Sequence, residues 1–236
     1  MVDKHLSTQF DSELNGVSSR VMELGGLVES QIRQAIYALA QFNAEAASQV
    51  LATEERVNQK EVEIDRELSS IIARRQPTAR DLRLLMAISK TTANLERVGD
   101  EAERIARIAE KLGNAELPEH YAFKLAQMGS LVRDQLRGTL DTFARMDETR
   151  ALERLRRDRE VDVLYKELTR LLVDLMQRES ERVPAALEML WGARALERIG
   201  DRCKNICEQV IYLVRGKDVR HTGLSRSAAP LPETKQ

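Results

Sequence analysis

The sequence predicts an all-α fold of two tandem, pseudo-symmetric three-helix bundles, with six long helices in all. Apolar residues recur at steps of three and four over most of the chain, the spacing that lines one face of an α-helix. Aromatic residues make up 4% of the 236 residues and charged residues 32%, which favours aliphatic cores between long amphipathic helices. The segment Leu95–Asp100 (LERVGD) returns 101 residues later as Leu196–Asp201 (LERIGD), and such a repeat indicates two similar domains.

The first half begins with two long helical patterns. An apolar stripe over residues 10–39 predicts the first helix. Asn43 is the expected N-cap of the second helix, because its side chain accepts hydrogen bonds from the backbone amides of a first turn. The stripe of that helix covers residues 50–71, and Pro77 ends it, because the residue before a proline is held out of the helical region.

The third helix follows at once. Thr78 with Asp81 three residues later resembles a capping box. The apolar pattern then runs over residues 85–112, and Gly113 followed by Asn114 is a C-terminal stop signal.

The pattern restarts after a linker that reaches Pro118. A fourth helix is predicted over residues 125–146, and Asp147 is the candidate N-cap of the fifth. Pro184 opens the sixth helix, because proline is favoured at the first helical position. Gly216 ends it. We therefore expect one bundle over residues 1–115, a second over 119–215 and a disordered tail over 216–236, which has no apolar period.

Charge and hydropathy exclude several classes of protein. A net charge of −1 argues against a nucleic-acid-binding surface. No segment approaches the roughly 18 uncharged apolar residues of a membrane span, and the N-terminus lacks the apolar region of a signal peptide. We expect a cytoplasmic protein. Cys203 and Cys207 are four residues apart, and we interpret them as small core residues rather than a redox or metal pair.

Acidic residues on facing helices predict metal binding. Each LER(V/I)GD motif places its Glu and Asp, four residues apart, on one face of a helix. Acids also interrupt the apolar stripe of the second helix in each half. Carboxylates brought together without a cation would repel one another, and a divalent cation removes that conflict. The candidate ligands are Glu54, Asn58, Glu96 and Asp100 in the first half, and Asp158, Asp162, Glu197 and Asp201 in the second.

The donor set limits the choice of metal. All-oxygen ligation suits hard cations such as Mg²⁺, Mn²⁺ or Ca²⁺, and carboxylate clusters also hold divalent or trivalent iron. Asn58 replaces an acid in the first half, so we expect the second-half site to bind metal more strongly. Gly99 and Gly200 share a face with the motif acids although a helical glycine costs about 1 kcal/mol against alanine. We expect them to leave room for cations or a crossing helix.

Two other functional classes compete with this interpretation. The acids could form surface salt bridges on a scaffold that binds no metal. Alternatively, the bundle could be a metal-dependent hydrolase or oxidase. The chain lacks the Glu-x-x-His motifs of di-iron bundles, a P-loop, a Gly-x-Gly-x-x-Gly turn and a nucleophile beside a histidine. We therefore predict that it is not an enzyme.

The motifs resemble those of one family. The two LER(V/I)GD copies, Val57–Asp65 (VNQKEVEID), Arg75–Arg83 (RQPTARDLR) and Arg198–Glu208 (RIGDRCKNICE) occur in the order found in the PhoU family. The resemblance covers about residues 5 to 221.

This resemblance implies a cytoplasmic, commonly dimeric regulator that acts with the phosphate ABC transporter and its sensor histidine kinase. It implies repression of the phosphate-starvation regulon, restraint of phosphate uptake, and membrane association only through those partners. The family's paired Glu/Asp-x-x-x-Asp motif also implies a metal site. The second half fits that motif fully, whereas Asn58 departs from it in the first half unless Glu61 or Asp65 contributes.

Overall fold

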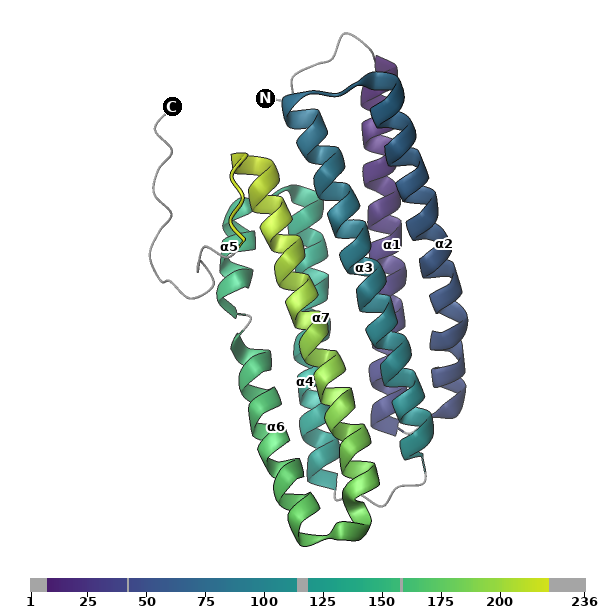
Figure 1. Ribbon diagram of the computed structural model, residues 1–236, viewed down its shortest axis with the longest axis vertical. Helices are drawn as coiled ribbons and strands as arrows, with labels where there is room; N and C mark the ends of the chain where they lie inside the picture. The colour runs from purple at the N-terminus through teal and green to yellow at the C-terminus, as the bar shows by residue number, and fades with distance from the viewer. Residues whose placement is uncertain (1–7, 42, 114–118, 158, 221–236) are drawn as a thin grey trace.

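The structure, a computed structural model, describes residues 8–41, 43–113, 119–157 and 159–220 (Figure 1). This part of the chain is helical and contains no strand. All six predicted helices are present, and the fifth is described as two segments, α5 up to Arg157 and α6 from Arg159, with residue 158 outside the described ranges. The helices are α1 (Thr8–Gln41), α2 (Ala44–Arg75), α3 (Ala79–Leu112), α4 (Glu119–Arg145), α5 (Glu148–Arg157), α6 (Arg159–Arg178) and α7 (Val183–Arg215), with a 3₁₀ turn, η1, at Ser180–Arg182.

Most predicted helix ends are confirmed by their hydrogen bonds. The Asn43 side chain accepts from the Ala46 amide at 2.8 Å, and Asp147 accepts from the Arg150 amide at 3.1 Å. Gly216 ends α7 with a φ of 69°, a left-handed conformation that glycine adopts without a steric penalty.

The capping box predicted at Thr78 is wrong. Thr78 occupies the N-cap position of α3, but its side chain makes no capping hydrogen bond. The reason lies in the next residue: Ala79 has a positive φ of 42°. The first helical residue is therefore left-handed, and the first-turn amides are not presented to the Thr78 hydroxyl as a capping box requires.

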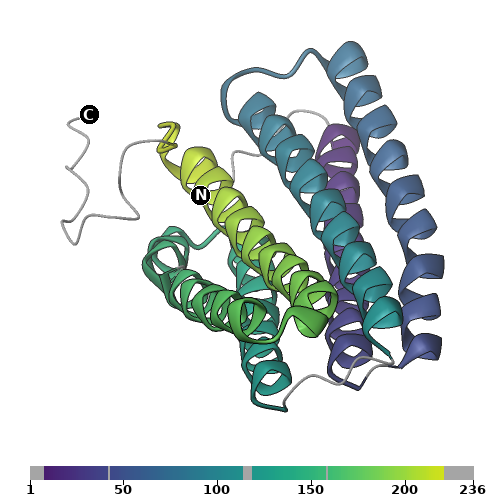
Figure 2. The ribbon, with the colours of Figure 1, turned by 60° about the horizontal axis from the view of Figure 1, so that its bottom comes forward.

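The two bundles lie side by side (Figures 1 and 2). Helices α1, α2 and α3 form one, and α4, α5, α6 and α7 form the other. The most extensive contact between them joins α3 to α7, which run antiparallel. Three polar pairs join the two helices: Asn94 with Asn205, Glu101 with Arg198, and Lys111 with Glu188. From each pair to the next, the position on α3 rises by seven and then ten residues, and the position on α7 falls by the same numbers.

Helices α1 and α4 meet through reciprocal glycines. A Cβ atom on Gly25 would lie 2.5 Å from Cδ2 of Leu140, and one on Gly129 would lie 2.9 Å from Cγ2 of Ile36. The two glycines are 104 residues apart, as are the two aliphatic residues. Each half therefore presents a side chain to the glycine of the other, which lets the helices approach closely.

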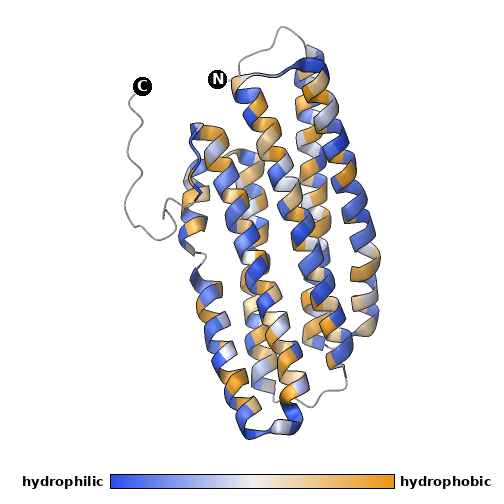
Figure 3. Ribbon diagram, in the orientation of Figure 1, coloured by the Kyte–Doolittle hydropathy of each residue, from blue (hydrophilic) through white to orange (hydrophobic). Residues whose placement is uncertain are grey.

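The core follows the predicted apolar stripes, and Figure 3 shows apolar residues recurring along each helix. Val17, Val21, Leu24, Val28 and Ile32 of α1 are fully buried. Cys203 and Cys207 are also buried, as expected of core residues. The predicted tail begins later than Gly216, because Val219 is buried against the core. Residues 221–236 lie outside the described part of the chain.

Among the described helices, none combines the length and the apolar character needed to cross a lipid bilayer.

Candidate metal site

A buried carboxylate lies at the centre of the first-half site. Glu54 of α2 is only 5% exposed. Gln31 of α1, which is fully buried, donates from Nε2 to Glu54 Oε2 at 2.7 Å. The other oxygen, Glu54 Oε1, is buried and has no hydrogen-bond partner among the described residues. A buried carboxylate oxygen without a donor is costly, so the arrangement calls for a positive partner.

Two acids of α3 form a cluster with Glu54. One carboxylate oxygen each from Glu54, Asp100 and Glu103 lie within 4.8 Å of one another. Glu54 is buried, Glu103 half-buried and Asp100 exposed, so the cluster reaches from the bundle interior to solvent. Three convergent carboxylates form an all-oxygen donor set, which fits a hard cation such as Mg²⁺, Mn²⁺ or Ca²⁺.

The pKa of Glu54 is raised by its surroundings. Burial raises its pKa from 4.5 to about 7, the hydrogen bond from Gln31 opposes the rise, and the charges of Asp100, Glu103 and Glu96 add to it. Metal binding would remove this conflict, because a nearby positive charge favours the ionised carboxylate.

Acidic character extends along the groove between α2 and α3. Burial raises the pKa of Glu96, as do Asp100 and Glu61, while Arg97 and Arg202 lower it. Burial likewise raises the pKa of Glu61, with Asp65 and Asp100 adding to the effect. Glu61 is thus close enough to Asp100 to interact with it electrostatically, and Asp65 is close enough to interact with Glu61.

The predicted first-half ligands do not all converge. Glu54 and Asp100 lie in the cluster, and Glu96 lies close enough to interact with Asp100 electrostatically. Asn58 is exposed and lines a shallow groove that also includes Glu54.

Sequence analysis missed Glu103. It lies outside the Glu-x-x-x-Asp motif but follows Asp100 by three residues, which places both on one helix face. That spacing was the available signal. Arg107 donates to Glu103 at 2.9 Å, so this acid reaches the cluster with part of its charge already balanced.

Gly99 supplies the space that the cluster occupies. A Cβ atom at this position would lie 2.8 Å from Glu54 Oε2, 3.1 Å from Val57 Cγ1 and 3.2 Å from Gln31 Oε1. The prediction that this glycine leaves room is therefore confirmed for a crossing helix: α2 and α1 bring polar side chains into the space that a side chain would fill.

Gly99→Ala is expected to destabilise the protein although alanine is the better helix former. The new methyl group displaces the Glu54 carboxylate from its bond with Gln31, which outweighs the roughly 1 kcal/mol gained from helix propensity. Gly26→Ala is the matched control, because Gly26 is exposed in the middle of α1 with nothing within 4 Å of its added Cβ. Urea unfolding should show stabilisation for the control only, and stabilisation of both would contradict the packing role.

The second-half acids are partly described. Burial raises the pKa of Glu197, Asp201 and Asp162 raise it further, and Arg194 and Arg198 oppose the rise. Arg194 donates to Glu197 Oε1 at 2.9 Å, while Glu197 Oε2 is buried without a hydrogen-bond partner in the described ranges. Three predicted ligands thus lie near one another. The fourth, Asp158, lies outside the described residues.

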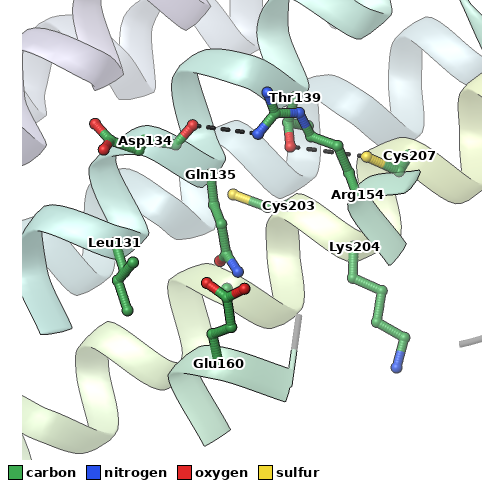
Figure 4. A pocket seen from close by; sticks show the side chains of 10 residues that line it. Leu131, Asp134, Gln135, Thr139, Arg154, Glu160, Cys203, Lys204 and Cys207 are labelled. Atoms are coloured by element: carbon green, nitrogen blue, oxygen red, sulfur yellow. Dashed lines mark hydrogen bonds between the residues drawn. The ribbon is translucent and has the colours of Figure 1, made fainter. Parts of the chain in front are cut away.

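Gly200, which precedes Asp201 in the sequence, lines a cavity of about 170 Å³ in the second bundle (Figure 4). Gly200 and Cys203 of α7, Gln135 of α4 and Glu160 of α6 contribute to its lining. The ends of the Gln135 and Glu160 side chains point toward one another. The cavity lies in the second bundle where α5, α6 and α7 meet α4.

The charge comparison that favoured the second half needs correction. It counted four acids there against three acids and an amide, but it omitted Glu103. The internal repeat aligns Glu103 with Lys204, which lines the second-half cavity. The first half therefore gains an acid where the second half carries a cation. Stronger metal binding by the second half stays a prediction.

Both halves of the chain match the PhoU domain, over residues 21–109 and 125–210. The chain is 45% identical to the phosphate-specific transport system accessory protein PhoU homolog of Pseudomonas putida, over 98% of this chain and 90% of that protein. It is 44% identical to the phosphate-specific transport system accessory protein PhoU of Escherichia coli strain K12, over 94% of this chain and 92% of that protein.

Solved structures agree with the fold. The crystal structure of PhoU from Pseudomonas aeruginosa matches with a TM-score of 0.85 and 42% identity, over 88% of this chain and 100% of that one. The phosphate transport system regulatory protein PhoU of Streptococcus pneumoniae matches with a TM-score of 0.83 and 30% identity, over 89% of this chain and 99% of that one. These matches confirm the predicted all-α, two-bundle architecture.

The relatives are named as accessory or regulatory proteins rather than enzymes, which confirms the prediction that the chain is not an enzyme. The matches extend over nearly the whole chain, at identities well above those at which only a fold is shared. The chain therefore belongs to the PhoU family.

Proposed function

We propose that this protein is a cytoplasmic regulator of phosphate homeostasis. It restrains uptake by the phosphate ABC transporter and represses the phosphate-starvation regulon when phosphate is plentiful. The observation that carries the proposal is similarity over nearly the whole chain to proteins named as accessory proteins of the phosphate-specific transport system. A net charge of −1 argues against a basic surface for DNA, so we infer that its effect on transcription is indirect.

The proposed route of action is through protein partners. The regulator binds the transporter and its sensor histidine kinase, acts as a homodimer and reaches the membrane only through them. Support for the kinase and for the dimer comes from the family resemblance.

Metal is the proposed cofactor, as Mg²⁺, Mn²⁺ or iron. Glu54, Asp100 and Glu103 would hold it in the first half, with Asp162, Glu197, Asp201 and Asp158 as the second-half ligands. A bound cation would supply positive charge that neutralises the acids. The unpartnered Glu54 Oε1 and the three converging carboxylates support this assignment. Elemental analysis of the purified protein tests the alternative of a scaffold that binds no metal. A turnover assay on metal-loaded protein tests the alternative of a hydrolase or oxidase.

Deleting the gene for this protein is expected to switch on phosphate-starvation genes in phosphate-rich medium, measured with an alkaline phosphatase reporter. Complementation with the wild-type gene is the control and should restore repression. A second deletion that also removes the sensor histidine kinase should return the reporter to its silent state, because the protein acts through the kinase. Full induction in the double deletion would contradict the proposed route, and so would operator binding by the purified protein at physiological salt.

A further inference from the structure

Gln31 is placed to control the carboxylate site from a third helix. We propose that it is a positioning residue: its amide fixes the Glu54 carboxylate so that Oε1 faces the cation, and its counterpart Gln135 serves the second bundle. This inference rests on the proposed metal function. It adds to that site a residue from the first helix of each bundle, a helix that carries none of the predicted ligands.

The contacts of Gln31 leave one carboxylate oxygen available. Gln31 Nε2 donates to Glu54 Oε2 at 2.7 Å and to the Val50 carbonyl oxygen at 3.4 Å. Both acceptors belong to α2, so the amide holds the carboxylate and the backbone one turn before it. Glu54 Oε1 receives no hydrogen bond from the described residues. An oxygen that is buried and has no donor is available to a cation.

A glutamine suits this position because its amide donates without adding charge. A lysine or arginine would neutralise Glu54 and compete with the cation, whereas a glutamate would add another repelling carboxylate. An aliphatic residue would leave Glu54 Oε2 buried without a donor. Gln31 is fully buried among apolar residues of α1, where a polar side chain has no packing advantage. Its hydrogen bond to Glu54 offsets the cost of burying its amide.

Gly99 lets the Gln31 and Glu54 side chains pack closely against α3. An added Cβ would lie within 3.2 Å of both Gln31 Oε1 and Glu54 Oε2, so the two side chains occupy the space of the missing one. The adjacent residue on α3 is Asp100, a member of the cluster. The three helices thus contribute one connected unit: a positioning amide from α1, an inner carboxylate from α2, and space with an outer carboxylate from α3.

The second bundle repeats the amide and the glycine. Gln135 of α4 follows Gln31 by 104 residues, the same offset that aligns Asp158 with Glu54. Gln135 and Gly200, which precedes Asp201 in the sequence, both line the cavity of the second bundle. Gln135 Oε1 is buried and, like Gln31 Oε1, has no hydrogen-bond partner in the described part of the chain. A glutamine with a buried, unpartnered Oε1 near a glycine of the third long helix thus occurs in both halves, which points to a shared role.

The test is Gln31→Met, which keeps a similar volume and removes the hydrogen bond. Mn²⁺ binding is measured by titration calorimetry in a background carrying Asp201→Asn, which disables the second-half site. We expect the first-half affinity to fall roughly 10- to 100-fold, the range typical of lost outer-shell partners. Gln34→Met is the matched control: Gln34 lies one turn along α1 and bonds only to the Gln49 side chain, at 3.3 Å. Its affinity should equal that of the background.

A purely structural role predicts a different result. Gln31→Met would then lower the unfolding midpoint but leave the Mn²⁺ affinity of the folded protein unchanged, and that outcome overturns the inference. Wild-type protein that binds no Mn²⁺ overturns the metal function itself, and the inference with it. The two failures are therefore distinguishable from the wild-type titration.

A measurement on wild-type protein covers the case in which Gln31→Met does not fold. In ¹⁵N-labelled protein, the side-chain amide resonances of Gln31 and Gln135 should shift when Mg²⁺ is added, and those of Gln34 should not. A Gln31 resonance that stays in place while Mg²⁺ binds would overturn the assignment.

Discussion

Glu54→Gln is expected to stabilise the metal-free protein by about 3 kcal/mol at pH 8. The pKa of Glu54 rises from 4.5 to about 7 on folding, chiefly through burial. One pKa unit corresponds to about 1.4 kcal/mol, and the difference between these values sets the size of the effect. The substitution removes the buried charge and keeps the shape of the side chain. The introduced amide also brings a donor next to Gln31 Oε1, an acceptor that has none.

The sign of the pH dependence follows from the direction of the shift. Between pH 4.5 and 7 the folded protein binds a proton at Glu54 that the unfolded chain has released. The free energy of unfolding therefore falls as pH rises through this window, and the loss is complete above pH 7. Wild-type protein in EDTA should lose about 3 kcal/mol from pH 4.5 to 8 through this group, and Glu54→Gln should lack that contribution.

Urea unfolding in EDTA at several pH values measures the difference. Glu55→Gln is the control, because Glu55 is the next residue on α2 and is exposed. Its pH profile should follow the wild type. A Glu54→Gln profile with the wild-type slope would show that Glu54 is already ionised in the folded protein without metal.

Glu54→Gln should also abolish the stabilisation of the folded protein by metal at the first-half site. A cation that binds only the folded state stabilises it in proportion to the logarithm of its concentration. In a background carrying Asp201→Asn, which leaves only the first-half site, Mn²⁺ is therefore expected to raise the unfolding midpoint and to have little effect once Glu54→Gln is added. Variants that respond equally would place the metal elsewhere.

The sequence predicted the fold because its signals are local. Apolar spacing, the caps at Asn43 and Asp147, and the glycine at the end of α7 each depend on residues within a turn or two. The Thr78 prediction was wrong for a related reason: the left-handed φ of Ala79 is a property of how α2 and α3 are joined, which the Thr-x-x-Asp pattern does not encode.

The site was only partly predictable because it depends on helix rotation. Gln31 and Glu54 lie 23 residues apart, and their bond requires α1 and α2 to face each other with particular sides. The spacing of apolar residues shows which side of a helix is buried, but it does not fix the rotation of the helix about its axis to a single residue. Gln31 lies within the apolar stripe of α1 and belongs to no recognisable motif, so the sequence did not indicate its role. The motif pointed to Asp100, whereas Glu103 required knowing which face of α3 meets α2.

The close approach of α1 and α4 sets the second large effect. Gly25→Leu is expected to destabilise the protein by about 3 kcal/mol, the upper end of the range for overpacking a core. Gly25 is buried, and even a methyl group there would lie 2.5 Å from Leu140 Cδ2. Leu140 is itself 5% exposed, so it has little freedom to move aside.

A double-mutant cycle with Leu140→Ala distinguishes this contact from general strain. Leu140→Ala alone should cost about 2–5 kcal/mol through the cavity it leaves. In the double variant the introduced leucine side chain fills that cavity, so the total loss should be smaller than the sum by about 1–3 kcal/mol, as for directly coupled residues. Gly26→Leu, at an exposed position of α1, should show no such loss and should gain up to about 1 kcal/mol through helix propensity. Additive losses in the double variant would contradict the reciprocal packing.

The internal repeat supplies an independent replicate of the cycle. Gly129 and Ile36 occupy the positions equivalent to Gly25 and Leu140 with the roles of the two helices exchanged. Gly129→Leu with Ile36→Ala should therefore show coupling of the same sign. Coupling in both cycles would mean that the bundles are held in register at two symmetric points. Packing between α1 and α4, away from the candidate metal ligands, would then help to fix how α3 and α7 pack together. Coupling in only one cycle would mean that the pseudo-symmetry of the sequence is not matched by symmetric energetics.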